Sequence, residues 1–238
     1  MSVLRLLPAL VVMSLFAGCG GGGGGKMQEL PTPPPLEVLR LSADRMEKLK
    51  SFHFLLSHKD GSIRIAFDLD MEKAEGDLVV PGRMKAKVDA RLRGAPIRVD
   101  VVSGDEKFWV KLPFGGGFQK VSGFALSDFF NPEKGIPLLM REATAAAVTR
   151  RDEIDRQKVI VVETDLDAGS LAGLVPVAKP GFPVRITLWI GEQDYLLWRL
   201  RIDGAMSGKD KADVVRTISL SKFDESVTIS LPGEGPTQ

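Results

Sequence analysis

The chain has 238 residues, 44% of them hydrophobic and 26% charged, with 32 basic against 31 acidic side chains. These figures exclude a disordered chain, a basic nucleic-acid binder and an acidic solvating tail. The length allows one large domain or two small ones with a substantial core. Cys19 is the single cysteine, which excludes an internal disulfide framework and a multi-cysteine zinc site.

Residues 1–18 (MSVLRLLPALVVMSLFAG) predict a signal peptide, because Arg5 is followed by an apolar run and then by small residues. The apolar run is too short to span a bilayer as a helix. Residues 15–19 (LFAGC) resemble the lipobox at which bacterial lipoproteins are cleaved, with Phe16 at the position where Leu is most common. That resemblance implies that the Cys19 thiol carries a diacylglyceryl group, with palmitate as the expected acyl chain, and becomes the mature N-terminus.

The alternative is an ordinary secretory leader with an incidental cysteine, but free cysteines are avoided in exported chains unless they are used. Cleavage before Cys19 removes one basic residue, Arg5, so that 31 basic side chains face 31 acidic ones. This balance argues against electrostatic attachment to anionic lipid, whereas a diacyl anchor supplies two chains, enough for stable association. We therefore expect a lipid-anchored protein of the cell membrane that faces the extracytoplasmic or periplasmic side.

Residues 19–35 predict a tether between the anchor and the folded domain. After the cysteine they contain six Gly and four Pro with almost no apolar residue, so a flexible coil should lead into an extended segment. A phosphate-binding loop would need a preceding strand and a following Lys-Ser/Thr, and the sequence has neither. The folded domain is predicted as a single unit over residues 36–238.

Residues 36–50 (LEVLRLSADRMEKLK) predict an amphipathic helix, because apolar residues recur at helical spacing opposite charged ones. From Ser51 onward apolar residues alternate with period two, which predicts half-buried strands. Short connections rich in Gly, Asp and Pro join the strands, so the sheet should be mostly antiparallel. About ten strands are expected, with apolar rows within residues 63–71, 84–92, 97–101, 108–112, 159–166, 184–190, 196–202, 214–220 and 227–231.

Helical segments are few in the rest of the sequence. A helix is expected at residues 137–147, a short turn or helix at 168–175, and another at 127–130. So few helices leave much of the apolar sheet face uncovered. The sheet can therefore close into a barrel or curl around the helices, and either arrangement would leave an apolar cavity. A tightly curled sheet that fills its own core is the alternative, and the periodicity alone does not decide between the two.

Catalytic and metal-binding patterns are absent from the sequence. His53 and His58 differ by five positions, so a strand would direct them to opposite faces, and HExxH, GxSxG, CxxC and P-loop patterns do not occur. Residues 114–118 (FGGGF) predict a hairpin tip, while Trp109 and Trp189 fall on nominally polar strand faces, where a loop or helix would cover them. We expect no enzyme, no metal site and no cofactor.

The chain also carries fold-level segments, none of them a catalytic signature, at residues 42–54, 76–82, 129–140, 184–190, 196–202 and 219–232. In their order and spacing these segments resemble the LppX/LprA/LprF/LprG family of lipoproteins, which is structurally related to the LolA and LolB lipoprotein carriers. The resemblance implies an α+β fold in which a curved antiparallel half-barrel sheet wraps a few helices around a hydrophobic cavity. That cavity would hold the acyl chains of a lipid or glycolipid.

The resemblance therefore predicts a membrane-anchored carrier of acylated lipids across the cell envelope. A lipid exporter in the membrane is a candidate partner, nucleic acid is not, and the chain is expected to be a monomer. The alternatives are a LolB-like acceptor of lipidated proteins and a non-catalytic surface interaction lipoprotein. Since the family supplies no binding motif, the cavity residues are nominated from the apolar rows: Ile63, Ile65, Phe67, Met84, Val88, Val99, Leu188 and Leu200 from strands, with Met46 and Leu139 from helices.

Overall fold

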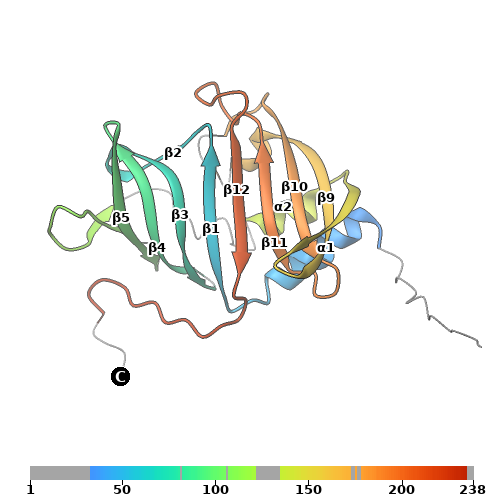
Figure 1. Cartoon of the computed structure of the whole chain (residues 1–238), viewed down its shortest axis with the longest axis horizontal. Coiled ribbons are helices and arrows are strands. Elements are labelled where there is room, and N and C mark those ends of the chain that lie inside the picture. Colours follow the sequence, from blue (N-terminus) through green and yellow to red (C-terminus); the bar gives the residue numbers. More distant parts are fainter. Residues whose placement is uncertain are drawn as a thin grey trace, which may run out of the picture. The chain divides into compact units, whose positions relative to one another are not determined.

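The computed structural model describes residues 33–80, 82–105, 107–121, 135–172, 175 and 178–234, all within the unit Pro33–Gln238 (Figure 1). The predicted leader, Cys19, most of the tether and the helix expected at residues 127–130 lie outside these residues. Within the described part of the chain, no helix has the length and apolar character needed to cross a membrane.

One antiparallel sheet forms most of the described unit, in the order β7-β6-β5-β4-β3-β1-β12-β11-β10-β9-β8, with β2 paired to β3. Twelve strands are present among the described residues, against about ten expected. Their bounds are β1 Ser51–Lys59, β2 Ile63–Ile65, β3 Leu69–Val79, β4 Arg83–Leu92, β5 Ala95–Gly104, β6 Lys107–Lys111, β7 Gln119–Val121, β8 Ala147–Ile154, β9 Gln157–Asp167, β10 Pro183–Gly191, β11 Leu197–Asp203 and β12 Val215–Ser221.

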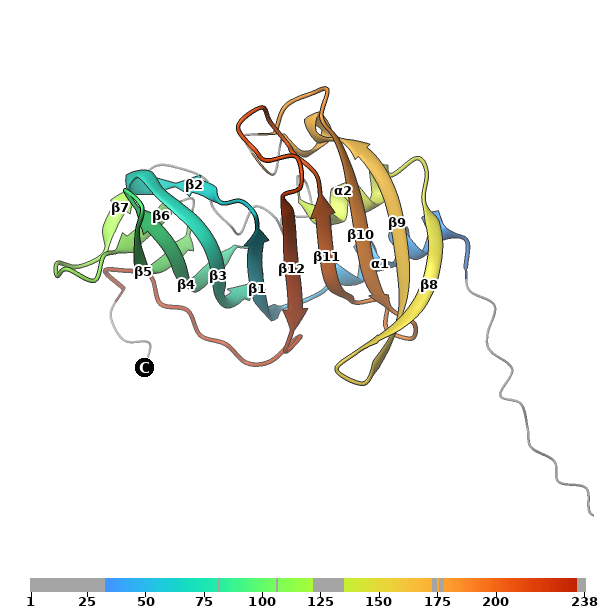
Figure 2. The same cartoon turned by 45° about the horizontal axis from the view of Figure 1, so that its top comes forward.

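The sheet consists of two halves that meet in its middle. From β1 the chain steps outward strand by strand to the edge strand β7, and the next strand, β8, forms the opposite edge. From β8 the chain steps inward to β12, which pairs with β1 so that Leu56 lies opposite Ile218 (Figures 1 and 2). Every strand pair between described residues is antiparallel, as the short connections predict.

Two α-helices lie on one side of the sheet, α1 (Pro35–Met46) and α2 (Ile136–Glu142), and both views place them behind β9 to β12. Each has a proline in its first turn, where the missing N–H costs nothing. The sheet face that they cover is called the inner face here. Its residues join α1 and α2 in one main core with contributions from both halves of the sheet, including Phe54, Met84, Val101, Leu188 and Leu220.

The row of apolar residues at 63–71 does not form the single predicted strand. It is broken at a 3-10 turn, η1 (Ala66–Asp68), in which Phe67 and Asp68 have φ of 59° and 55°. The left-handed backbone at these two positions reverses the chain, so that β2 folds back on β3 with Ile65 opposite Leu69. The reversal leaves Phe67 40% exposed. The expectation that this residue faces a cavity is therefore wrong.

The strand predicted at residues 227–231 is also absent. This segment is irregular and packs on the outer face of the sheet, where Ile229 and Leu231 are buried with Val102 and Trp109. The prediction that a loop covers Trp109 is confirmed. Trp189 is buried with Val159 and Val161 in a second outer cluster, with the guanidinium groups of Arg150 and Arg199 over its ring at 5.7 and 5.5 Å.

The remaining differences concern short or exposed elements. The helix expected at 137–147 ends at Glu142, because Ala147 already begins β8, a strand exposed at almost every residue and therefore without an apolar row. The short turn or helix expected at 168–175 is a 3-10 turn, η3 (Ala168–Leu171). Residues 114–118 connect the two paired strands β6 and β7, as predicted for the tip of a hairpin.

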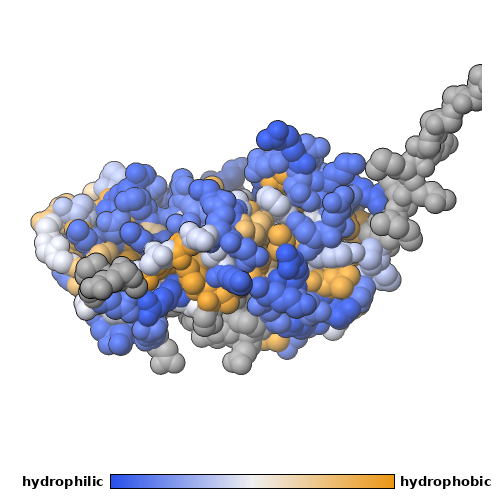
Figure 3. All heavy atoms as spheres, turned by 90° about the horizontal axis from the view of Figure 1, so that it is seen from below, coloured by the Kyte–Doolittle hydropathy of each residue, from blue (hydrophilic) through white to orange (hydrophobic). Residues whose placement is uncertain are grey.

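The surface seen from below is largely hydrophilic, with apolar residues gathered in a band across its middle (Figure 3). Large apolar side chains that are individually exposed among the described residues are Leu36, Phe67, Phe114 and Val148. Such scattered positions are ordinary for a folded domain. Most of the buried apolar residues of the described chain belong to the main core on the inner face of the sheet.

Close packing of β3 against β4 at Gly76 gives a direct test of this arrangement. A Cβ added at Gly76 would lie 2.6 Å from the Cα of Ala86 and against the carbonyl oxygen of Lys85, both backbone atoms. Gly76→Ala should therefore lower the free energy of unfolding, measured with urea, by about 1–3 kcal/mol. Gly117→Ala is the control, because its Cβ meets nothing within 4 Å, and it should change stability by less than about 0.5 kcal/mol. Equal effects would contradict the register.

Candidate functional site

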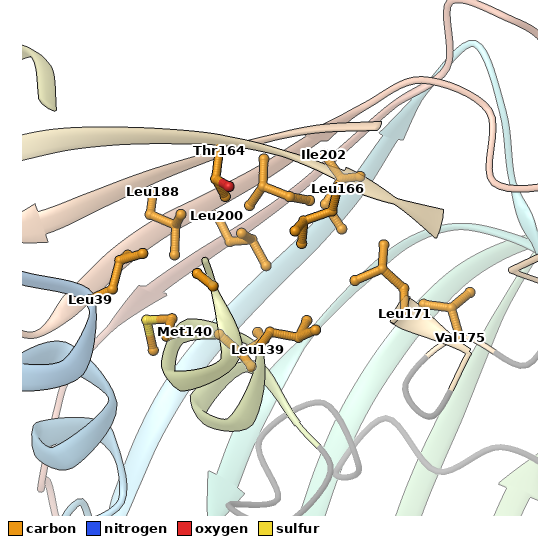
Figure 4. A pocket seen from close by; sticks show the side chains of 13 residues that line it. Leu39, Leu139, Met140, Thr164, Leu166, Leu171, Val175, Leu188, Leu200 and Ile202 are labelled. Atoms are coloured by element: carbon orange, nitrogen blue, oxygen red, sulfur yellow. The ribbon is translucent and has the colours of Figure 1, made fainter. Parts of the chain in front are cut away.

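An apolar cavity lies between the helices and the inner face of β9 to β11. It contains about 490 Å³ of space free of protein atoms, part of it open to solvent. Figure 4 shows the side chains of the strands pointing toward those of α1, α2 and η3 across this space. The lining residues are Leu39, Ile136, Leu139, Met140, Ala143, Thr164, Leu166, Leu171, Val175, Ile186, Leu188, Leu200 and Ile202.

The walls of this first cavity offer a ligand almost no hydrogen bond. Thr164 is the one polar side chain among the lining residues, and its hydroxyl donates to the carbonyl oxygen of Ala145 at 2.7 Å. All other lining side chains are aliphatic or methionine. A ligand of this space would be held by desolvation of its own apolar surface, without polar recognition.

The helical wall of the cavity is fastened by Arg141 at the end of α2. Its guanidinium donates to Asp44 at 2.8 Å and to Glu47 at 2.6 Å, both at the end of α1. The same hydrogen bond holds the pKa of the Asp44 carboxyl below its usual range. Since α2 is short and buries only Ile136, Pro137 and Met140, these ion pairs add to the contacts that position the wall.

A second, narrower cavity adjoins the first where both are lined by Val175, Leu200 and Ile202. It contains about 290 Å³ free of protein atoms, part of it open to solvent. It differs from the first by containing two polar residues, His58 of β1 and Arg216 of β12. The other residues that line it are Leu56, Ile63, Met206 and Ile218.

The polar side chains of the second cavity form hydrogen bonds with backbone carbonyl oxygens and with one carboxylate, that of Asp210. Arg216 donates to Asp210 at 2.7 Å and to the carbonyl oxygen of Gly204 at 3.2 Å, and both charged side chains are largely buried. His58 Nδ1 lies 3.2 Å from the carbonyl oxygen of Glu72. Burial lowers the pKa of His58 to about 4, so the imidazole is neutral at neutral pH and its Nδ1–H donates to that carbonyl.

A larger hollow of about 1040 Å³ lies on the outer face, between β1, β3, β4 and β5 and residues 227–229. Most of its charged side chains are paired with one another: Lys73 with Glu75 at 3.0 Å, Lys87 with Asp100 at 3.1 Å, and Arg98 with Asp89 at 2.5 Å. These pairs neutralise the surface locally and leave no concentrated field for a charged ligand. The inner cavities are therefore the stronger candidate site.

The nominated cavity residues fall into three groups. Leu139, Leu188 and Leu200 come together in the first cavity, and Ile63 lies with Leu200 in the second. Met46 is buried but lines neither cavity, and its sulfur accepts from the backbone N–H of Leu197 at 3.5 Å.

The other nominated residues lie away from the described cavities. Met84, Val88 and Val99 are fully buried in the core of the opposite half of the sheet, Ile65 is partly buried against the same core, and Phe67 is exposed. The alternation of apolar and polar residues along β4 and β5 correctly identifies which residues lie on the inner face. It does not tell which part of that face lies beside a hollow.

Most of the residues that line the first cavity are not among the nominated ones. Two of them, Ile186 and Ile202, belong to the predicted apolar rows of β10 and β11, so the sequence contains a signal for them. Leu39 was recognisable only as an apolar position of the first helix, and Leu171 and Val175 only as part of a short helical segment. Leu39 lies before β1, and Leu171 and Val175 lie between β9 and β10. Their meeting with the strands depends on tertiary packing, which a local pattern does not encode.

Among the described residues, no group of three or more His, Cys, Asp or Glu side chains is arranged to hold a metal ion. The family model of the LppX_LprAFG lipoprotein matches residues 34–229, which include every helix and strand described above. The chain belongs to the LppX_LprAFG lipoprotein family.

Two curated members of the family are similar to the chain over most of its length, and both are named lipoarabinomannan carrier protein LprG. The protein of Mycobacterium leprae is 25% identical over 225 residues, which cover 92% of this chain and 90% of the relative. That of Mycolicibacterium smegmatis is 23% identical over 229 residues, with 92% and 91% coverage. Neither name, nor the family description, refers to a catalytic activity.

Solved structures of the family show the same fold. LprF from Mycobacterium bovis superposes with a TM-score of 0.67 at 21% identity, covering 86% of this chain and 99% of that one. LppX from Mycobacterium tuberculosis has a TM-score of 0.61 at 21% identity, with 84% and 100% coverage. The predicted α+β half-barrel and the predicted family are therefore confirmed.

Loss of the ion pairs of Arg141 should make α2 more mobile. Arg141→Met removes the ion pairs between α2 and α1, and exposed pairs of this kind contribute modestly. Hydrogen exchange of the α2 amides should therefore accelerate roughly two- to fivefold, while the amides of β3 to β5 are unchanged. Arg185→Met is the control, because Arg185 of β10 pairs with Asp165 of β9, away from Asp44 and Glu47. Unchanged exchange in α2 would contradict a fastening role.

Proposed function

We propose that this protein binds acylated lipids or glycolipids in its inner apolar cavity and carries them across the cell envelope. The observation that supports this proposal most directly is a cavity whose single polar side chain is already hydrogen-bonded within the protein. Such walls suit methylene groups, and burial of each contributes roughly 0.8 kcal/mol. The carrier names of two family members agree with this assignment.

The size of the cavity suggests how such a ligand is held. The space of about 490 Å³ includes solvent at its open side, so the enclosed part between the helices and the strands is narrow. Entry of an acyl chain would therefore require the helical wall to move, while the head group stays at the mouth. The short α2, fastened by Arg141, is the part of the wall best placed to do so.

A LolB-like acceptor of lipidated proteins is the second candidate, since an acyl chain on a protein would meet the same apolar wall. The two functions differ in what the purified protein contains. A carrier retains a diacyl or triacyl lipid that organic solvent extracts and mass spectrometry identifies, whereas an acceptor retains a lipidated polypeptide. A domain that contains neither and takes up no added lipid would contradict both.

Blocking the cavity should remove its lipid. Leu139 is a partly buried α2 residue that points into the space in Figure 4, so Leu139→Trp should lower the lipid recovered per protein at least about fivefold by occupying the volume that a chain would fill. Glu142→Trp, on the exposed side of the same helix, is the control and should retain the wild-type amount. Circular dichroism must show both variants folded. Equal lipid content in the two would count against this cavity.

We also propose that the protein is anchored by a diacylglyceryl group on Cys19 and carries its domain on the tether at residues 19–35. Cys19→Ala removes the only thiol and should shift the protein from the membrane fraction to the soluble fraction. Ser14→Ala, within the same leader, should leave it in the membrane. Continued membrane association of the cysteine variant, after a high-salt wash that removes electrostatic attachment, would refute the anchor.

A further inference from the structure

Two buried polar atoms in the second cavity have no hydrogen-bond partner among the described residues, Nε of Arg216 and Nε2 of His58. Arg216 is only 5% exposed, and both residues line the cavity. They occupy directly opposite positions on β12 and β1, where the Cβ atoms of an antiparallel pair lie about 4.5–5.5 Å apart. Both residues therefore border the same small space.

The two atoms differ in hydrogen-bonding character. Arg216 Nε–H is a donor, since a guanidinium has no acceptor. His58 donates through Nδ1 to the carbonyl oxygen of Glu72, and because burial keeps the ring neutral, with a pKa of about 4, its Nε2 is an acceptor. The pair offers one donor and one acceptor side by side.

The charge of the site is already balanced. Arg216 forms an ion pair with Asp210 at 2.7 Å, and Asp210 also accepts from the backbone N–H of Met206 at 2.8 Å. No net positive charge is left in the second cavity to attract an anion into an apolar environment. The group that fits is neutral and both donates and accepts.

We propose that His58 and Arg216 bind a hydroxyl group, of an alcohol or of an undissociated carboxyl, on an acyl or alkyl chain that occupies the adjoining apolar cavity. The O–H donates to His58 Nε2, and the oxygen accepts from Arg216 Nε–H. The shared residues Val175, Leu200 and Ile202 place this polar site next to the cavity that would hold the chain. The inference deepens the proposed function and rests on it, since it adds selectivity among lipid chains.

An ester or a bare alkyl end would not satisfy the pair. An ester carbonyl accepts from Arg216 but leaves His58 Nε2 unpaired, and an alkane leaves both atoms unpaired. Because an unmatched buried polar group is costly, chains that carry a hydroxyl should bind more tightly than otherwise identical chains without one. A difference of roughly tenfold is expected for one recovered hydrogen bond in a buried site.

The test uses the full chain, purified in detergent and freed of lipid by extraction. It is incubated in turn with hexadecanol, hexadecanoic acid, methyl hexadecanoate and hexadecane, and the bound fraction is measured by native mass spectrometry over a concentration series. We expect hexadecanol to bind roughly tenfold more tightly than methyl hexadecanoate and hexadecane. Equally tight binding of hexadecanoic acid would show that an undissociated carboxyl group also occupies the site.

Two substitutions remove the pair separately. His58→Phe removes the acceptor, and Arg216→Lys removes the Nε donor while keeping a cation beside Asp210. Each should abolish the preference for hexadecanol and keep the binding of hexadecane. His53→Phe is the matched control, on the same strand but facing Asp77 at 2.7 Å on the outer side, and it should keep the preference.

The outcomes separate the two proposals. Equal binding of all four probes by the wild-type protein would overturn the hydroxyl site, as expected if an internal water satisfies the pair, and would leave lipid binding intact. Failure of every probe to bind would overturn the proposed function itself. If one variant does not fold, the wild-type comparison and the other variant still decide.

Discussion

Burial of the inner face of one long antiparallel sheet is the constraint on which the structure depends. Strands from both halves place apolar rows on this face, yet only α1, α2 and η3 lie against β9 to β11 in the described structure. Apolar area in contact with water is unfavourable in proportion to its extent. The sheet therefore curves, and where side chains from helices and strands do not fully meet, an apolar cavity remains between them.

The pairing of β1 with β12 makes this arrangement possible. These strands are far apart in sequence, but their register places Leu56 opposite Ile218 and His58 opposite Arg216. The first pair belongs to the main apolar core. The second introduces two unpaired hydrogen-bonding atoms into an interior that is otherwise aliphatic. In the proposed hydroxyl site, the pairing of β1 with β12 therefore both completes the core and supplies the polar selectivity of the cavity.

The sequence predicts the fold where apolar residues alternate regularly, as at β4, β10 and β12. It fails where local backbone geometry overrides that alternation. Phe67 continues the apolar row but lies in a left-handed turn, and β8 has no apolar row because it is exposed. The sequence predicts that an apolar cavity exists but identifies only some of its residues. The helix–strand contacts of Leu39 and Leu171 do not follow from spacing within one segment, and neither does the pairing of His58 with Arg216.

The central claim is that an acyl chain occupies the space between α2 and the inner face of β9 to β11. The most direct measurement is photo-crosslinking with a fatty acid that carries a diazirine near its methyl end, followed by peptide mapping of the labelled protein. The account predicts labels on residues of the two inner cavities, such as Leu139, Leu188 and Leu200. Labels confined to the outer face, or spread without saturation as the probe concentration rises, would contradict it.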